Sequence, residues 1–81
     1  GDVRVGEGVA IGKGARIVGP SVIGDDVVIG DGARIERSIV WNGARIGAHA
    51  QLRDTIVGER YAVEKGVTLE GAIVANEPAT A

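Results

Sequence analysis

The sequence places an aliphatic residue at every sixth position over most of its length. The series starts at Val5 and continues without interruption to Ile35. The next interval is one residue shorter and ends at Val40, and the same shortening recurs before Val57 and Val74. A period of six matches neither the period of about 3.6 of an amphipathic helix nor the simple alternation of an isolated strand. A fixed internal repeat of this kind predicts an architecture of stacked units.

The shortened interval comes after every third repeat, which indicates that three repeats make one turn of a triangular coil. Residues 1–75 then form an all-β parallel β-helix of about four coils. Residues 76–81 leave the pattern, and we expect this tail to fray. The aliphatic residues expected in the core are Val5, Ile11, Ile17, Ile23, Ile29, Ile35, Val40, Ile46, Leu52, Val57, Val63, Leu69 and Val74.

A second inward-facing row lies two residues before each aliphatic position, because alternate residues of a strand share a face. Most members of this row are small, as a narrow core requires. Tyr61 is the exception, and its ring must either widen the coil or lie at the edge of the core. Ser21, Ser38 and Thr55 belong to the same row, which predicts an internal series of hydroxyls bonded to the backbone.

The chain must bend three residues before each aliphatic position, and glycine or aspartate usually stands there. These residues tolerate a positive φ better than most others. His49 occupies the same position, and histidine is also enriched in that backbone region. We therefore expect His49 to be a turn residue. The other expected bend residues are Gly8, Gly14, Asp26, Gly32, Gly43, Gly66 and Gly71.

The composition argues against several classes of function. The formal net charge is −2, and no basic run, aromatic pair for stacking on RNA or zinc-ligand spacing is present, so we expect no nucleic-acid partner. The chain has no cysteine, which excludes disulfides and cysteine-ligated metals. No segment resembles a signal peptide or approaches membrane-spanning length. We expect no membrane partner and a cytoplasmic location.

Two kinds of stretch carry a resemblance to known proteins. Units such as Ile11 to Arg16 and Ile29 to Arg34 resemble the hexapeptide repeats of left-handed parallel β-helices, and the left hand follows from this resemblance alone. The stretches Ser38 to Gly47 and Leu52 to Gly58 resemble the C-terminal domain of sugar-nucleotide pyrophosphorylases, in particular mannose-1-phosphate guanylyltransferases. The resemblance covers nearly the whole chain.

The resemblance implies a division of labour. In that family the chemistry belongs to an N-terminal α/β domain with a glycine-rich nucleotide loop and metal-binding carboxylates, and this sequence contains neither. The resemblance implies a non-catalytic assembly and support domain of a sugar-1-phosphate nucleotidyltransferase, without catalytic, cofactor-binding or metal-binding residues of its own. Two alternatives remain open: a fragment of a hexapeptide-repeat acyltransferase, and a stand-alone or engineered β-helix without a ligand.

His49 is the only histidine, and an acyltransferase assignment would depend on it. Acyltransferases of the β-helical class use a histidine as general base, and β-helical carbonic anhydrases bind zinc with three histidines. One histidine cannot supply that set of three. The assignment of His49 to a turn is therefore favoured over a catalytic role.

Charged residues recur at the shortened corner of successive coils. Glu36, Arg53 and Glu70 alternate in sign at equivalent positions, and Arg37 faces Asp54. Stacked strands lie about 4.8 Å apart, so we expect a surface ladder of ion pairs, each worth up to about 1 kcal/mol. An anion or effector site formed by two of these arginines, Arg37 and Arg53, is the alternative.

A second pair of arginines, Arg16 and Arg34, occupies equivalent positions on the first two coils. We expect them to stack without a partner. A solvated face is the favoured interpretation, and a site for a phosphate or an acidic partner surface is the alternative.

The residue before each aliphatic core position points outward, and the three resulting outward rows differ in composition. Two rows mix charged, polar and small residues. The third is wholly aliphatic across four coils and consists of Val22, Ile39, Ile56 and Ile73. A contiguous apolar patch of this kind marks an interface, and Trp41 at its border would anchor it. We expect the partner to be a second copy of the chain or the catalytic domain of a parent protein.

Overall fold

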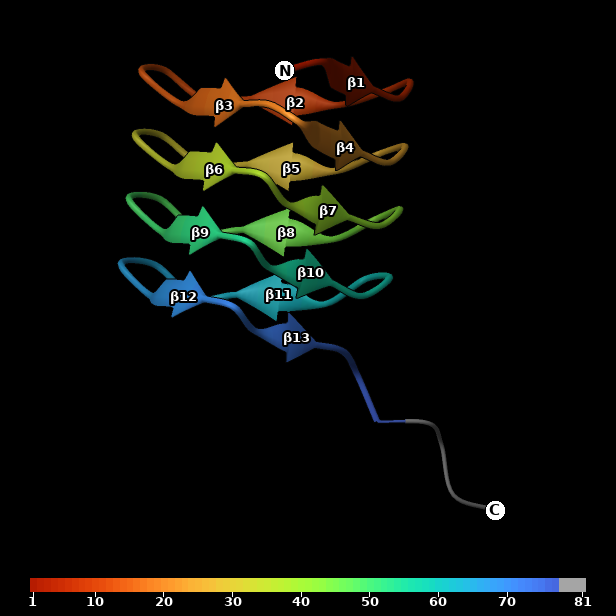
Figure 1. The fold of residues 1–81 in the computed structure, drawn as a ribbon, viewed down its shortest axis with the longest axis vertical. Coiled ribbons are helices and arrows are strands. Elements are labelled where there is room, and N and C mark those ends of the chain that lie inside the picture. Colours follow the sequence, from red (N-terminus) through yellow and green to blue (C-terminus); the bar gives the residue numbers. More distant parts are fainter. Residues whose placement is uncertain (78–81) are drawn as a thin grey trace.

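The computed structural model of the protein describes residues 1–77, which form thirteen short strands and no helix. The strands stack as three parallel sheets that make the sides of a coil (Figure 1). The first sheet consists of β1 (Val3–Val5), β4 (Ser21–Ile23), β7 (Ile39–Val40), β10 (Ile56–Val57) and β13 (Ile73–Val74). The second consists of β2 (Ala10–Ile11), β5 (Val28–Ile29), β8 (Arg45–Ile46) and β11 (Ala62–Val63). The third consists of β3 (Arg16–Val18), β6 (Arg34–Glu36), β9 (Gln51–Arg53) and β12 (Thr68–Glu70).

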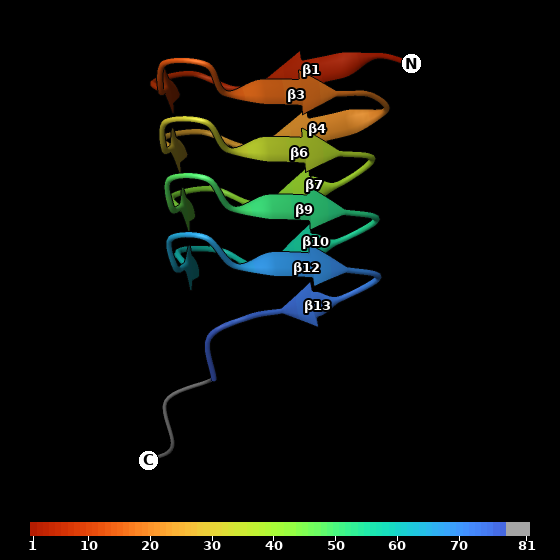
Figure 2. The same ribbon diagram turned by 90° about the vertical axis from the view of Figure 1, so that its left-hand side faces the viewer.

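The stacking register confirms that three repeats make one coil. Arg4 pairs with Val22 of the next coil, Val22 pairs with Ile39, and Ile39 pairs with Ile56. The first of these steps is one residue longer than the later ones, as the spacing of the aliphatic residues requires. The shortened spacing therefore marks one corner of the coil, between the third sheet and the first. Figure 2 shows the strands of the third sheet directly below one another.

The all-β solenoid of about four coils is thus confirmed. The left hand of the coil remains a prediction.

The core lies inside the three sheets and is filled by the predicted aliphatic rows. Eight of the predicted residues are buried: Ile23, Ile29, Ile35, Val40, Ile46, Leu52, Val57 and Val63. Small residues of the second inward row, such as Ala33, Ala44 and Ala50, are buried between them. The alternation of large and small side chains lets successive coils approach to the spacing of a sheet.

The first coil departs from the prediction of a uniformly buried core. Val5 is 46% exposed and Ile11 is 51% exposed. Both belong to strands at the end of their sheets, so nothing in residues 1–77 stacks on their outer side. At the other end, Leu69 and Val74 are only partly buried for the same reason, and Tyr61 borders a cavity of about 230 Å³ there. The repeat fixes which residues point inward, whereas burial also requires a neighbouring coil.

The expected bend residues adopt the left-handed backbone conformation. Asp26 has a φ of 56° and His49 a φ of 61°, and all the glycines predicted at this position also have positive φ. Arg37, Asp54 and Arg60 adopt the same conformation. They were not named among the expected bend residues, although each stands three residues before a core position. On the second and later coils, each of these positions donates its backbone N–H to the preceding coil. One example is the bond from His49 N to the carbonyl of Asp31, at 2.8 Å.

The predicted internal row of hydroxyls is present and fully bonded. Ser38 accepts a hydrogen bond from the backbone N–H of Thr55 at 3.1 Å and donates its own hydroxyl to the carbonyl of Glu36 at 2.7 Å. Ser21 and Thr55 make equivalent bonds on the coils above and below. Among residues 1–77, no buried side-chain nitrogen or oxygen lacks a partner.

The glycines that follow the core positions leave room for polar side chains of the next coil. Asn42 Oδ1 accepts the backbone N–H of Asp25 at 2.8 Å, and a Cβ on Gly24 would collide with this carboxamide. Asp25 and Asp31 bond to the first coil in the same way. At the far end, Asn76 donates to the carbonyl of Glu59 at 3.3 Å. This bond lies inside the segment 76–81 that we expected to fray, and residues 78–81 of that tail lie outside the described residues.

Replacement of Ile46 by aspartate tests the assignment of the core. Ile46 is 2% exposed, so Ile46→Asp buries an unpaired carboxylate between coils. We expect the free energy of unfolding to fall by more than about 4 kcal/mol, enough to unfold a chain of this size. Chemical denaturation followed by circular dichroism measures the loss. Arg45→Asp on the same strand points outward and should change stability by no more than about 0.5 kcal/mol. Equal losses for both variants would contradict the assignment.

Candidate functional site

The outward face of the first sheet carries the predicted aliphatic row. Val22, Ile39, Ile56 and Ile73 are paired in register on four successive strands, and we call them the apolar row. Val22 is 44% exposed, Ile39 38% and Ile73 78%. Arg4 precedes this row on β1, where it pairs with Val22. The predicted placement of the row is therefore confirmed, and its role as an interface remains a prediction.

Trp41 lies directly after β7, beside the apolar row. It follows Ile39 by two residues and is 53% exposed. The corresponding positions of the preceding and following coils are occupied by Gly24 and Gly58. Because glycine has no side chain, nothing in this column flanks the indole on the adjacent coils. Trp41 is therefore an exposed aromatic residue without a side chain at the equivalent position of either adjacent coil.

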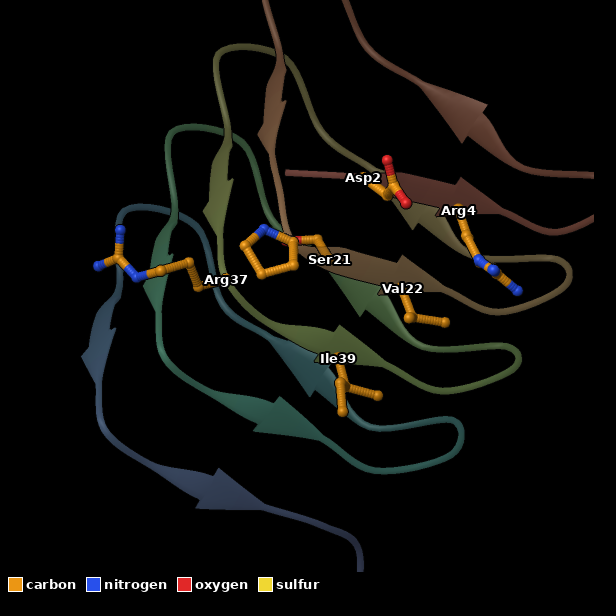
Figure 3. A pocket seen from close by; sticks show the side chains of 7 residues that line it. Asp2, Arg4, Ser21, Val22, Arg37 and Ile39 are labelled. Carbon is orange, nitrogen blue, oxygen red and sulfur yellow. The ribbon is translucent and has the colours of Figure 1, made fainter.

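A hollow of about 380 Å³ lies on the other side of the apolar row (Figure 3). We call it the Pro20 hollow, and its lining residues are Asp2, Arg4, Pro20, Ser21, Val22, Arg37 and Ile39. The guanidinium of Arg37 lies on the side away from Val22 and Ile39 (Figure 3). The hollow was not predicted from the sequence. The signal was available, because Pro20 stands in the one connection from the third sheet to the first that is not shortened, and Arg4 occupies the position of the apolar row on the first coil.

The shortened corner carries an ion-pair cluster around Glu36. Arg53 of the next coil approaches the carboxylate at 3.0 Å, and Arg34 approaches it at 2.7 Å. The expectation that Arg34 lacks a partner was wrong. Arg34 and Glu36 are two residues apart on β6, so their side chains leave the strand on one face. Arg16, in register with Arg34, takes part in none of the ion pairs found among residues 1–77.

The second predicted pair at this corner is also present. Arg37 donates two hydrogen bonds to Asp54, from Nε to Oδ1 at 2.8 Å and from Nη2 to Oδ2 at 3.2 Å. This bond lowers the pKa of Asp54 and raises that of Arg37. The hydrogen bond from Arg34 is the main cause that lowers the pKa of Glu36 below its ordinary value of 4.5. Arg37 and Arg53 are thus each held by a carboxylate, which disfavours the alternative of an anion site.

His49 lies at an exposed corner in the place expected for a turn residue. Its imidazole covers Gly32 of the preceding coil, where a Cβ would collide with the ring. Within residues 1–77, no three His, Asp or Glu side chains come together as a group that could hold a metal ion. The described part of the chain also contains no helix long and apolar enough to cross a membrane.

These features define the class of the domain, a hexapeptide-repeat parallel β-helix with an apolar outer face. The chain belongs to the GMPPB C-terminal domain family, whose model matches residues 1–81. The resemblance seen in the sequence is thereby confirmed. The domain is a β-helix of the sugar-nucleotide pyrophosphorylase type.

Similar proteins include members of two enzyme classes. A UTP–glucose-1-phosphate uridylyltransferase of Synechocystis sp. is 38% identical over 65 residues, which are 80% of this chain and 17% of that protein. A histidine-to-alanine mutant of GDP-perosamine N-acetyl transferase from Caulobacter crescentus, solved with CoA and GDP-perosamine, matches with a TM-score of 0.71 and 34% identity. That match covers 90% of this chain and 39% of the transferase. The chain therefore spans less than half the length of either protein.

The Glu36 cluster predicts a pH dependence of stability. Because the pKa of Glu36 is lower in the folded than in the unfolded chain, its contribution is fully present above the ordinary value of 4.5 and is lost as the pH falls through the lowered value. We expect the free energy of unfolding to fall more steeply below about pH 5 in the parent than in Glu36→Gln. Denaturation series from neutral to acidic pH measure both slopes. Glu70→Gln, outside the ion pairs of residues 1–77, is the control and should keep the parental slope.

His49→Ala distinguishes a turn residue from a general base. Alanine tolerates a φ of 61° less well than histidine, but the imidazole is exposed, so we expect the free energy of unfolding to fall by less than about 1 kcal/mol. We expect neither the parent nor the variant to release free CoA from acetyl-CoA in a thiol assay. Turnover by the parent that disappears in the variant would establish the acyltransferase alternative.

Proposed function

We propose that this β-helix is the non-catalytic assembly and support domain of a sugar-1-phosphate nucleotidyltransferase, and that it associates through the apolar row. The apolar row is the observation that carries the proposal. The second and third sheets place residues such as Arg45, Arg34 and Gln51 at the equivalent outward positions. Only the first sheet presents aliphatic residues on four successive coils, with Trp41 at the border.

The energetics favour association of moderate strength. Full burial of one aliphatic side chain is worth about 1.5–3 kcal/mol, and the side chains of the apolar row are already partly covered by one another. Several of them must therefore act together to offset the cost of association. The exposed tryptophan adds the kind of side chain that dominates interface energies.

The proposal extends to the partner and the location. The partner is a second copy of the chain or the catalytic domain of a parent enzyme. The cytoplasmic location expected from the sequence is kept as part of the proposal. No role in binding nucleotide, metal or CoA is proposed for the described residues.

The acyltransferase fragment is the second candidate, and the similarity to GDP-perosamine N-acetyl transferase favours it. The position of His49 argues against it. The backbone of His49 closes a corner with a bond to Asp31, and the imidazole rests on Gly32. Gly32 has no side chain. The carboxylate of Asp31 accepts the backbone N–H of Lys13 at 2.8 Å, and among residues 1–77 it makes no ion pair with the imidazole that would orient a general base.

A double charge substitution tests the proposed face. Ile39→Lys with Ile56→Lys places two like charges at the centre of the apolar row, where both residues point outward and the core stays intact. We expect association to be abolished in sedimentation equilibrium and the circular dichroism spectrum to be retained. Val28→Lys with Ala62→Lys on the second sheet is the matched control, which should associate as the parent does. Equal association of the Ile39/Ile56 variant and the parent would exclude the apolar row as the interface.

A further inference from the structure

An exposed tryptophan and a hollow lie on opposite sides of the apolar row. Trp41 follows Ile39 by two residues, whereas Pro20 and Arg37, which line the hollow, precede the row by two residues. Two residues of extended chain span about 6–7 Å, so the Cα of Trp41 and the hollow lie at similar distances from the row. Trp41 and Arg37 also belong to the same coil, since both flank β7.

The lining of the Pro20 hollow suits an aromatic ring. The guanidinium of Arg37 is bonded to Asp54 and lies away from Val22 and Ile39 (Figure 3). The aliphatic part of Arg37 and the ring of Pro20 therefore remain as an apolar surface. A planar indole packs well on such a surface.

The first coil carries a pair of opposite charges on the same face. Asp2 and Arg4 border the hollow, and neither takes part in the ion pairs found among residues 1–77. The guanidinium of Arg4 lies on the side away from Asp2 (Figure 3). An acidic group of a partner could pair with Arg4 from that side. A cationic group of the partner could pair with Asp2 from the opposite side.

We propose that two copies of the chain associate face to face with parallel coil axes, related by a two-fold axis that runs along the apolar row. This rotation brings the side of the face that carries Trp41 opposite the partner's side that carries the hollow. Each coil lies opposite the same coil of the partner. Trp41 then enters the hollow formed by the partner's Pro20 and the partner's Arg37, and Arg4 faces the partner's Asp2. Both contacts form twice. This inference rests on the proposed role of the apolar row in association.

The antiparallel arrangement fits the same face less well. It would place the first coil at the level of the partner's Ile73, so that Arg4 could not reach the partner's Asp2. It would also place Trp41 against the partner's Trp41 and leave both hollows empty. The parallel arrangement sets each residue of the apolar row beside its own counterpart.

Single-cysteine variants determine the orientation, because the chain contains no cysteine of its own. In the parallel pair, Val22→Cys and Ile73→Cys should each cross-link to a second copy of the same variant with a short bis-maleimide. In an antiparallel pair centred on Ile39, the two copies of residue 73 lie about 19 Å apart, four strand spacings, and should not react. Val28→Cys on the second sheet is the control and should stay uncross-linked. Failure of Ile73→Cys to cross-link while Val22→Cys reacts with Ile56→Cys would overturn the parallel arrangement.

Trp41→Ala tests the contact with the hollow. We expect its self-association constant to fall by about tenfold or more, against less than about threefold for Val28→Ala. Because Trp41 is the only tryptophan, its emission should shift to shorter wavelength as the concentration of the parent rises through the dissociation constant. An unchanged association constant, or an emission maximum independent of concentration, would overturn the contact.

Charge exchange tests the pairing of Arg4 with Asp2. Asp2→Arg and Arg4→Asp should each weaken self-association by about threefold to tenfold, and the variant with both changes should return to within about threefold of the parent. Additive losses in the double variant would overturn this pairing.

If Ile39→Lys with Ile56→Lys abolishes association and no single-cysteine variant cross-links, assembly through the apolar row stands and the two-fold arrangement fails. A chain that stays monomeric at every concentration overturns the two-fold arrangement and leaves the catalytic domain as the partner of the face.

Discussion

Hydrogen bonds between successive coils are the interaction on which the rest of this structure depends. Strands of two or three residues have no stability alone, and each becomes ordered only by pairing with the coils on either side. The bonds run in both directions: Gly24 donates to Val40 of the following coil, whereas His49 donates to Asp31 of the preceding one. Outside the strand pairs, the backward bonds come from the residues with positive φ and from Ser21, which donates to Asp2. The left-handed corners are therefore part of the ladder that holds the coils together, as well as the means of turning the chain.

Most of the fold could be predicted because a solenoid repeats one local rule. The spacing of the aliphatic residues identified the three-sided coil, and the shortened interval identified its corner. The hydroxyl row was predictable for a different reason, since Ser21, Ser38 and Thr55 occupy inward positions where an unbonded hydroxyl would be costly. In each case the residue type and its phase within the repeat pointed to the same environment.

The details that escaped prediction depend on more than phase. The positions equivalent to Arg34 in the neighbouring coils hold no carboxylate, and its partner Glu36 lies two residues away on the same strand. Gly24 makes room for the side chain of Asn42 on the next coil, a contact that its residue type alone does not indicate. The Pro20 hollow arises where the first connection from the third sheet to the first keeps its full length. Such a local irregularity is invisible to an argument built on regularity.

The constant step from one coil to the next, from Val22 to Ile39 and from Ile39 to Ile56, has a consequence for how such a domain can change its size. A tandem duplication or deletion of one such step, for example of the segment 39–55, would add or remove one whole coil and leave every corner and core layer in phase. A change that is not a whole number of such steps would shift all later residues out of register. The length of the domain along the coil axis therefore changes in steps of about 4.8 Å, the distance between neighbouring strands. Its length can be varied by genetic recombination without the invention of any new contact.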